Sequence, residues 1–223
     1  MTQRTVEGAP AYPIWDLAVR LIHWSLPPAI ALMWWTGEQG HMDLHEWVGY
    51  GLLCLILTRI VWGLLGTESS RFSTFLRGPH AIWRYVRVGG VFPGHNPLGA
   101  LSVVALLIFM LTQAVTGLFS RDDLLFEGPF SYWVGDLSGQ LTEWHKLNWL
   151  ILQCLIALHL SAIAWHQWRR HEPLIQAMWS GSAAHKISTS PPRPFWMAGG
   201  IFLVSAMLLW LLIRLAPEAP SYY

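Results

Sequence analysis

The sequence predicts an all-α membrane protein, a four-helix transmembrane bundle followed by a fifth transmembrane helix near the C-terminus. Of its 223 residues, 53% are hydrophobic and 12% are charged, whereas a soluble domain carries roughly 25% charged residues. An apolar run of about 20 residues crosses a hydrocarbon core of roughly 30 Å as a helix. Five such runs are present, at residues 15–35, 44–66, 97–119, 144–168 and 195–215.

The runs divide the chain into one membrane domain and its flanking segments, with no internal repeat. The N-terminal tail is polar and lacks the basic region and cleavage site of a signal peptide, so we expect the first run to remain as a helix. The predicted parts are a cytoplasmic tail at 1–14, the four-helix domain at 15–170, a cytoplasmic linker at 171–194, and the fifth helix with a periplasmic tail at 195–223.

The distribution of Lys and Arg predicts the orientation. Cytoplasmic loops carry an excess of these residues, and placing the N-terminus in the cytoplasm leaves only Arg121, Lys146 and Arg214 at the outer side. We therefore predict a multi-pass protein of the bacterial inner membrane, surrounded by lipid, with its C-terminus in the periplasm. The net charge of +1 gives no indication of nucleic-acid binding. The basic residues assigned to the inner side or its membrane edge are Arg4, Arg20, Arg71, Arg77, Arg84, Arg87, Arg169, Arg170, Lys186 and Arg193.

The fourth run carries two histidines, His145 and His159, fourteen residues apart. An ionisable ring inside a membrane helix costs free energy, so such a residue indicates a functional site. Fourteen residues of helix span roughly 21 Å and return to within about 40° of the starting direction. The two rings therefore face the same neighbours at two depths, with His145 expected at the outer surface.

Histidines of the first two runs match these depths. The first helix runs outward, so His23 lies near the inner level of His159; the second runs inward, so His45 begins near the outer level of His145. Two pairs of imidazoles on facing helices predict two bis-histidine haems held inside a bundle. Zinc would gather three or four ligands around one ion, and levels roughly 20 Å apart exclude one shared metal. A Cys-x-x-Cys-His sequence for covalent haem attachment is absent from the chain.

Four further residues are candidates to support the cofactors. Gly49, one turn after His45, leaves space for a porphyrin beside its helix. Arg59 lies fourteen residues after His45, hence on the same face at the inner level, where a buried guanidinium requires an anion such as a haem propionate. Arg20, one turn before His23, can serve likewise. For His95, contact with a propionate or a quinone and a helix-capping role both remain open.

Four segments carry a family resemblance: YPIWDLAVRLIHW, LHEWVGYGLLCLILTRIVWGLLG, GHNPLGALSVVALLIFMLTQAVTGL and EWHKLNWLILQCLIALH. Together they resemble the bacterial cytochrome b561 family, and most closely its branch of nickel-iron hydrogenase b-type cytochrome subunits, over about residues 12–170. The resemblance implies a bundle with two b haems that passes electrons between a quinone pool and a partner protein. It also implies the ligands His23, His45, His145 and His159.

We therefore predict a dihaem b-type cytochrome, an electron-transfer subunit rather than a stand-alone catalyst. Its expected partners are the quinone pool and a periplasmic redox protein, either a c-type cytochrome or an oxidoreductase subunit, in a homo- or hetero-oligomer. The acidic segment from Ser120 to Glu143 is a candidate docking surface. Two alternatives remain, namely a self-contained quinone-linked oxidoreductase acting on a small oxidant at the outer face, and a haem-free transporter that uses the histidines as a proton relay.

Overall fold

The computed structural model describes residues 12–90, 95–122, 126–182 and 190–217. Five helices in these ranges are long and apolar enough to cross a membrane, which confirms the predicted fold class. Their bounds are α1 (Leu17–Gln39), α2 (Met42–Leu65), α5 (Pro97–Phe119), α7 (Leu137–Arg169) and α9 (Trp196–Arg214).

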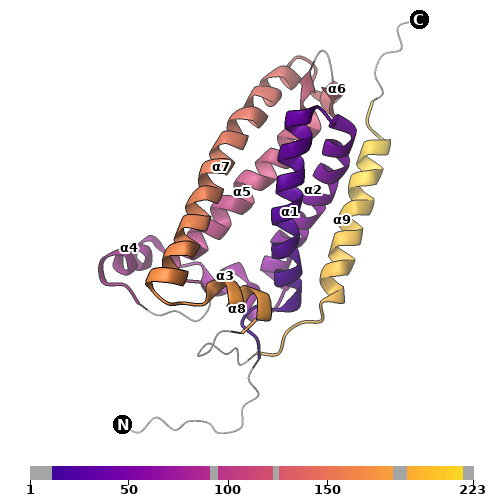
Figure 1. The fold of residues 1–223 in the computed structure, drawn as a ribbon. Helices are drawn as coiled ribbons and strands as arrows, with labels where there is room; N and C mark the ends of the chain where they lie inside the picture. Colours follow the sequence, from indigo (N-terminus) through magenta and orange to yellow (C-terminus); the bar gives the residue numbers. More distant parts are fainter. Residues whose placement is uncertain (1–11, 91–94, 123–125, 183–189, 218–223) are drawn as a thin grey trace, which may run out of the picture.

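Short elements connect the long helices at the two ends of the bundle (Figure 1). The loop between α2 and α5 includes a helix that begins with Pro79. The short elements of the described residues are η1 (Glu68–Ser70), α3 (Phe72–Phe75), α4 (Pro79–Val88), β1 (Arg121–Asp122), β2 (Phe126–Glu127), α6 (Ser131–Val134) and α8 (Leu174–Ser180).

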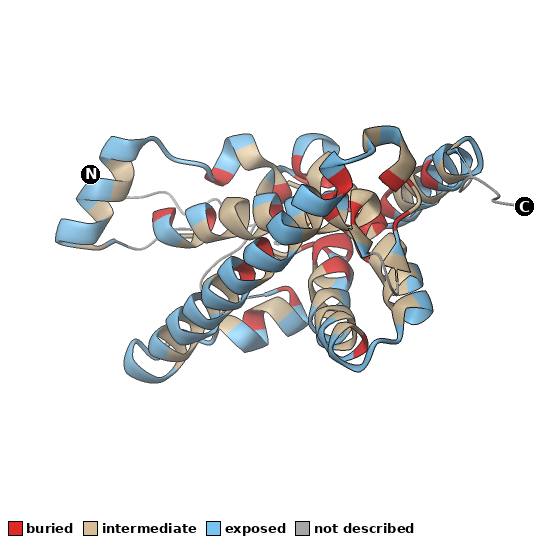
Figure 2. Ribbon diagram, turned by 90° about the horizontal axis from the view of Figure 1, so that it is seen from above, coloured by how far each residue is buried: buried red, intermediate tan, exposed pale blue. Residues whose placement is uncertain are grey.

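The bundle consists of two helical hairpins. Helix α1 packs on α2, α5 packs on α7, and the hairpins meet through α2 and α5. A central core forms where they meet, from Leu52 and Ile56 of α2, Leu107 and Met110 of α5, and Leu152 of α7. Figure 2 shows the buried residues gathered inside the bundle and the exposed residues along its outward faces. Many large apolar side chains are exposed on the molecule. Contact with membrane lipid accounts for such exposure.

Helix α9 lies against α2, on the side of the bundle away from α7 (Figure 1). Its Leu209 is buried in a cluster with Leu53 and Cys54 of α2. The opposite side of α9 exposes Trp196, Leu203 and Met207. The predicted fifth helix therefore packs on the four-helix bundle through α2.

The fourth long helix begins earlier than expected. Helix α7 starts at Leu137, seven residues before the predicted start at 144. The prediction followed hydropathy, and the first two turns of the helix are too polar to belong to the apolar run. At the other outer connection, Gly40 ends α1 with the left-handed φ of 73°, a conformation that glycine adopts without a steric cost. Helices α1 and α7 thus both extend beyond their apolar runs at the outer end of the bundle.

A buried carboxylate, Asp16, joins three elements at the inner end. Its Oδ1 accepts a hydrogen bond of 2.8 Å from the Val19 backbone N–H and so caps α1. Its Oδ2 accepts from the indole N–H of Trp62 in α2 at 3.0 Å and from the Ser70 hydroxyl in η1. With 3% of its surface exposed, Asp16 fixes α1 against the end of α2.

We predict that Asp16→Ala lowers the thermal stability of the protein in detergent. Loss of a helix cap costs about 1 kcal/mol, and each buried donor left without a partner costs roughly 1–3 kcal/mol more. Asp16→Asn should lower the stability less, because its amide oxygen still caps the helix while its NH2 group replaces the oxygen that accepts from Trp62 and Ser70. A melting temperature unchanged in the alanine variant, measured by circular dichroism, would contradict this role.

Candidate haem site

The outer pair of histidines comes together as predicted. His45 of α2 and His145 of α7 have ring centroids 6.5 Å apart. An imidazole nitrogen lies about 2 Å from a first-row metal such as zinc, so two rings on opposite sides of one metal have centroids roughly 6 Å apart. Both rings line a cavity of about 330 Å³ formed by α1, α2, α5 and α7. The arrangement therefore fits one metal ion held between two imidazoles.

The early start of α7 changes the surroundings expected for His145. Because α7 begins at Leu137, His145 lies two turns inside the helix, and its ring is half-buried rather than at the outer surface. His45, near the start of α2, is half-buried as well.

The His45 ring is fixed by α1. Its Nδ1 lies 3.1 Å from the Thr36 hydroxyl and 3.0 Å from the Met33 carbonyl oxygen. A carbonyl oxygen only accepts hydrogen bonds, so Nδ1 carries the proton and donates it. The lone pair of His45 is therefore on Nε2, the nitrogen available to a metal.

The His145 ring is fixed by α5 in a similar way. Its Nδ1 lies 3.1 Å from the Thr116 hydroxyl, and its Nε2 lies 2.9 Å from the Gln113 side-chain nitrogen. The Gln113 amide oxygen in turn accepts from the side-chain N–H of Asn148 at 2.6 Å. An amide nitrogen only donates, so Nε2 of His145 also holds a lone pair.

The inner pair is also brought together. His23 of α1 lies close enough to His159 of α7 and to Arg59 of α2 to interact electrostatically with both. These rings have fewer partners than the outer ones. The buried Nδ1 of His23 lacks a hydrogen-bond partner among the described residues, and Nδ1 of His159 reaches only the Ser102 hydroxyl at 3.5 Å.

The two candidate arginines differ in environment. Arg59 is only 7% exposed, its guanidinium carbon lies 5.2 Å from the Phe72 ring centroid, and its Nη1 is without a hydrogen-bond partner in the part of the chain described. Arg20 instead donates to the backbone carbonyl of Trp179 in α8. Arg59 is thus a buried cation whose Nη1 still needs an acceptor, whereas Arg20 also tethers α1 to the inner loop.

Glycines leave room around the outer rings. Gly49 lines the cavity, and a Cβ there would lie 3.5 Å from the Met33 side chain, an ordinary contact. A Cβ on Gly117 would lie only 3.1 Å from Cε1 of His145, and one on Gly37 would lie 3.4 Å from Cε1 of His45. Sequence reasoning singled out Gly49 and missed the other two, although each follows one of the threonines that bond the rings.

Other histidines lie outside the pairs. The His95 ring lies 4.5 Å from Trp15 and 4.6 Å from Phe75, centroid to centroid. The capping role considered for it belongs to Asn96, whose side chain accepts from the Gly99 N–H at 2.7 Å. Within the described residues, His, Cys, Asp and Glu form no group of three or more that can hold a metal ion.

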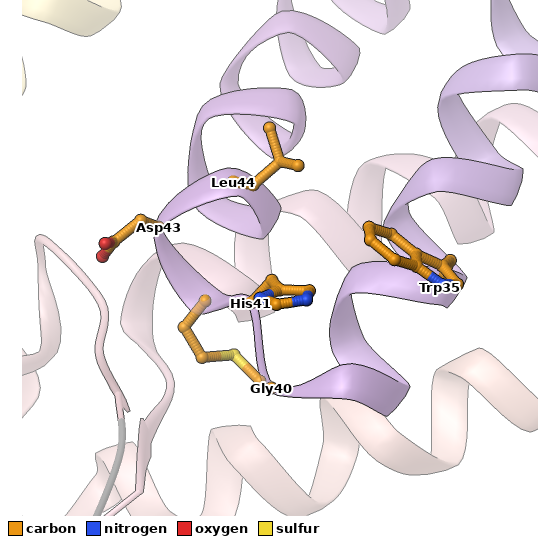
Figure 3. A pocket seen from close by; sticks show the side chains of 6 residues that line it. Trp35, Gly40, His41, Asp43 and Leu44 are labelled. Carbon is orange, nitrogen blue, oxygen red and sulfur yellow. The ribbon is translucent and has the colours of Figure 1, made fainter.

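A second hollow, of about 510 Å³, lies at the short outer connection between α1 and α2 (Figure 3). Trp35 and His41 face each other across it with ring centroids 5.2 Å apart, and Asp43 points away from Trp35. Its lining comes from α1, its cap and the first turn of α2, so this hollow lies at the surface beside the histidine pairs. The cavity inside the bundle remains the candidate cofactor site.

Comparison with known proteins relates the chain to a family of cytochromes. The model of the family "Prokaryotic cytochrome b561" matches residues 14–181. The "Probable Ni/Fe-hydrogenase B-type cytochrome subunit" of Bradyrhizobium diazoefficiens is 24% identical over 216 residues, which cover 78% of this chain and 86% of the relative. The "Probable Ni/Fe-hydrogenase 1 B-type cytochrome subunit" of Escherichia coli (strain K12) is 20% identical over 228 residues, covering 82% of this chain and 95% of the relative.

No solved structure matches the chain. The family match covers most of the described helices and includes all four paired histidines. A bundle of apolar helices with facing imidazoles is also the architecture that such a cytochrome needs. The chain therefore belongs to the prokaryotic cytochrome b561 family, and it is an integral membrane b-type cytochrome of electron transport.

Proposed function

We propose that this cytochrome holds two b haems and carries electrons across the inner membrane between the quinone pool and a redox partner. The observation that carries the proposal is the stacking of two histidine pairs, both of which join the α1–α2 hairpin to α7. His45 and His145 would hold the outer haem, and His23 and His159 the inner one. Bound haem supplies one-electron redox chemistry, and the protein positions and tunes it.

The side chains around each pair suit this task. The fixed tautomer of His45 presents Nε2 as a ligand, and Nε2 of His145 is equally unprotonated. The Gln113 amide bonds that nitrogen, so it would turn aside when iron is bound. At the inner level the unpartnered Nη1 of Arg59 would receive a propionate, with Arg20 nearby on α1. Gly49 would leave space for the porphyrin beside α2.

The proposed partner at the outer face is a redox protein. The two relatives are named as subunits of a Ni/Fe hydrogenase, so an oxidoreductase of that class is the first candidate, with a c-type cytochrome as the second. A quinone is the proposed partner at the membrane, and the exposed side of α9 offers surface for assembly into an oligomer. We place the N-terminus in the cytoplasm, as the Lys and Arg distribution favours.

Two variants test the pairing of ligands. We expect His145→Ala to lose the outer haem and His159→Ala to lose the inner one, because each removes one of the two imidazoles that would hold that haem. The haem-to-protein ratio and the reduced absorption spectrum of the purified protein measure this. His41→Ala is the control, since His41 is exposed at the outer connection. A ratio near two in both ligand variants would contradict the pairing, and a wild type without low-spin haem would favour a proton relay.

A third variant tests the buried cation. Arg59→Leu removes a positive charge at the inner level, and a nearby positive charge favours the reduced iron. We therefore expect the variant to lower the midpoint potential of the inner haem and to spare the outer one. Arg59→Lys retains the charge and should retain most of the potential. A redox titration in which only the outer haem shifts would contradict the assigned depth.

Docking at the outer face can be tested through salt. In the acidic segment from Ser120 to Glu143, Glu127 pairs with Arg121 at 3.3 Å and Glu143 pairs with Lys146 at 2.9 Å. Asp122 is one of the residues that line the cavity, and Asp123 lies outside the described residues. Acids beside the outer site would steer a basic partner toward it.

We expect the rate of electron exchange between the outer haem and a basic partner protein to fall with salt. The screening length shortens from about 30 Å at 0.01 M to about 10 Å at 0.1 M. Asp122→Asn combined with Asp123→Asn should lower the rate at low salt and weaken its salt dependence. Glu172→Gln, on the inner loop, is the matched control. Stopped-flow rates indifferent to both salt and the double substitution would contradict docking at this segment.

A further inference from the structure

The two hairpins carry the same small arrangement around the outer histidines. In the first hairpin, the Thr36–Gly37 dipeptide of α1 faces His45 of α2; in the second, Thr116–Gly117 of α5 faces His145 of α7. The hydroxyl-to-Nδ1 distance is 3.1 Å in both hairpins. Each imidazole is thus held by the neighbouring helix of its own hairpin.

The direction of these hydrogen bonds follows from the second bond of each hydroxyl. Thr36 donates to the Leu32 carbonyl at 2.8 Å, and Thr116 donates to the Thr112 carbonyl at 2.7 Å. A hydroxyl has one proton and two acceptor lone pairs, so each threonine can only accept from the imidazole. Both histidines therefore donate through Nδ1 and present an unprotonated Nε2.

The glycine of each dipeptide sets how closely the ring approaches the helix. A Cβ at residue 117 would meet the His145 ring at 3.1 Å, tighter than an ordinary contact, and one at residue 37 would meet the His45 ring at 3.4 Å. In the second hairpin, glycine thus helps the His145 ring to reach the Thr116 hydroxyl, whereas at residue 37 a Cβ would make an ordinary contact with His45.

The inner level lacks this arrangement. The buried Nδ1 of His23 is without a partner among the described residues, and Nδ1 of His159 lies 3.5 Å from the Ser102 hydroxyl, at the limit of a hydrogen bond. The two levels thus differ in the group that controls ligand basicity. A histidine that donates through its second nitrogen has a fixed orientation and is a more basic ligand.

We propose that Thr36 and Thr116 are positioning residues that fix the two histidines that would hold the outer haem, and that they would lower its potential relative to the inner haem. The inference rests on the proposed function, since it needs iron at the outer pair. A more basic ligand favours the more positive, oxidised iron, so removing either hydroxyl bond should weaken the donation from Nδ1 and raise the outer potential, although His45 still donates to the Met33 carbonyl at 3.0 Å. Removing both should raise it further and leave the inner potential in place.

The test is a redox titration of the purified holoprotein with Thr36→Val, Thr116→Val and the double variant. Each single variant is expected to shift the outer midpoint upward, and each tenfold change in the relative affinity for oxidised and reduced iron corresponds to about 59 mV for one electron. Electron paramagnetic resonance of the oxidised protein should show altered g values at the outer haem only, because the rings would lose their fixed orientation.

Two controls separate the hydrogen bond from general effects of substitution. Thr36→Ser and Thr116→Ser keep the hydroxyl and should keep the wild-type potential. Thr58→Val removes a buried hydroxyl of α2 that donates to the Cys54 carbonyl at 2.6 Å. It should leave the outer potential unchanged. If the valine variants do not fold, the serine variants still decide, since an outer potential raised in them would overturn the inference.

The failure of this inference differs from the failure of the proposed function. A wild type that binds two haems, with an outer potential unmoved in the double valine variant, would overturn the role of the threonines alone. An equal shift in Thr58→Val would overturn it as well. A wild type that binds no haem at the outer pair, or retains that haem in His45→Ala, would overturn the proposed function and the inference together.

Discussion

The constraint on which this structure depends is that a polar ring inside a lipid-embedded bundle needs partners from the protein itself. Water is excluded from the hydrocarbon region, so an unsatisfied N–H or lone pair there is costly. The outer histidines meet this requirement through neighbouring helices, His45 through Thr36 and Met33, and His145 through Thr116 and Gln113. The packing of α1 on α2 and of α5 on α7 therefore determines how the two rings are oriented.

The pairing of helices explains why a cofactor fits at the centre. Contacts run from α1 to α2, from α2 to α5 and from α5 to α7, so the two hairpins form the sides of a site whose histidines come from α1, α2 and α7. The cavity at the outer level lies inside this arrangement, and its lining includes Asp122 and Lys146. At the inner end, Asp16 accepts a hydrogen bond from Trp62 and caps α1, and Arg20 donates to a backbone carbonyl of α8. The inner end is thus held by fixed polar bonds, while the outer level keeps open space.

Much of this was predictable because helix periodicity and depth are properties of the sequence alone. The five apolar runs predicted the long helices, and fourteen-residue spacing placed His145 and His159 on one face. The early start of α7 was missed because its first turns are polar, and hydropathy reports lipid contact rather than helix.

The Thr–Gly dipeptides were missed for a different reason. Each is only two residues long and lies 9 or 29 residues before its histidine, so neither gives a repeat that a sequence pattern reveals; the link is made in space, across each hairpin.

The surroundings of the two histidine pairs favour different oxidation states of a bound iron. At the outer level both rings are neutral donors to hydroxyl oxygens, which on the proposed function favours oxidised iron. At the inner level Arg59 adds a buried positive charge beside His23, which favours reduced iron. Asp16 interacts electrostatically with Arg59 and offsets part of that charge, but its two oxygens already accept from Val19, Trp62 and Ser70. Both effects lower the energy of an electron at the inner level relative to the outer one. On the proposed function, an electron would therefore be more stable on the inner haem than on the outer one.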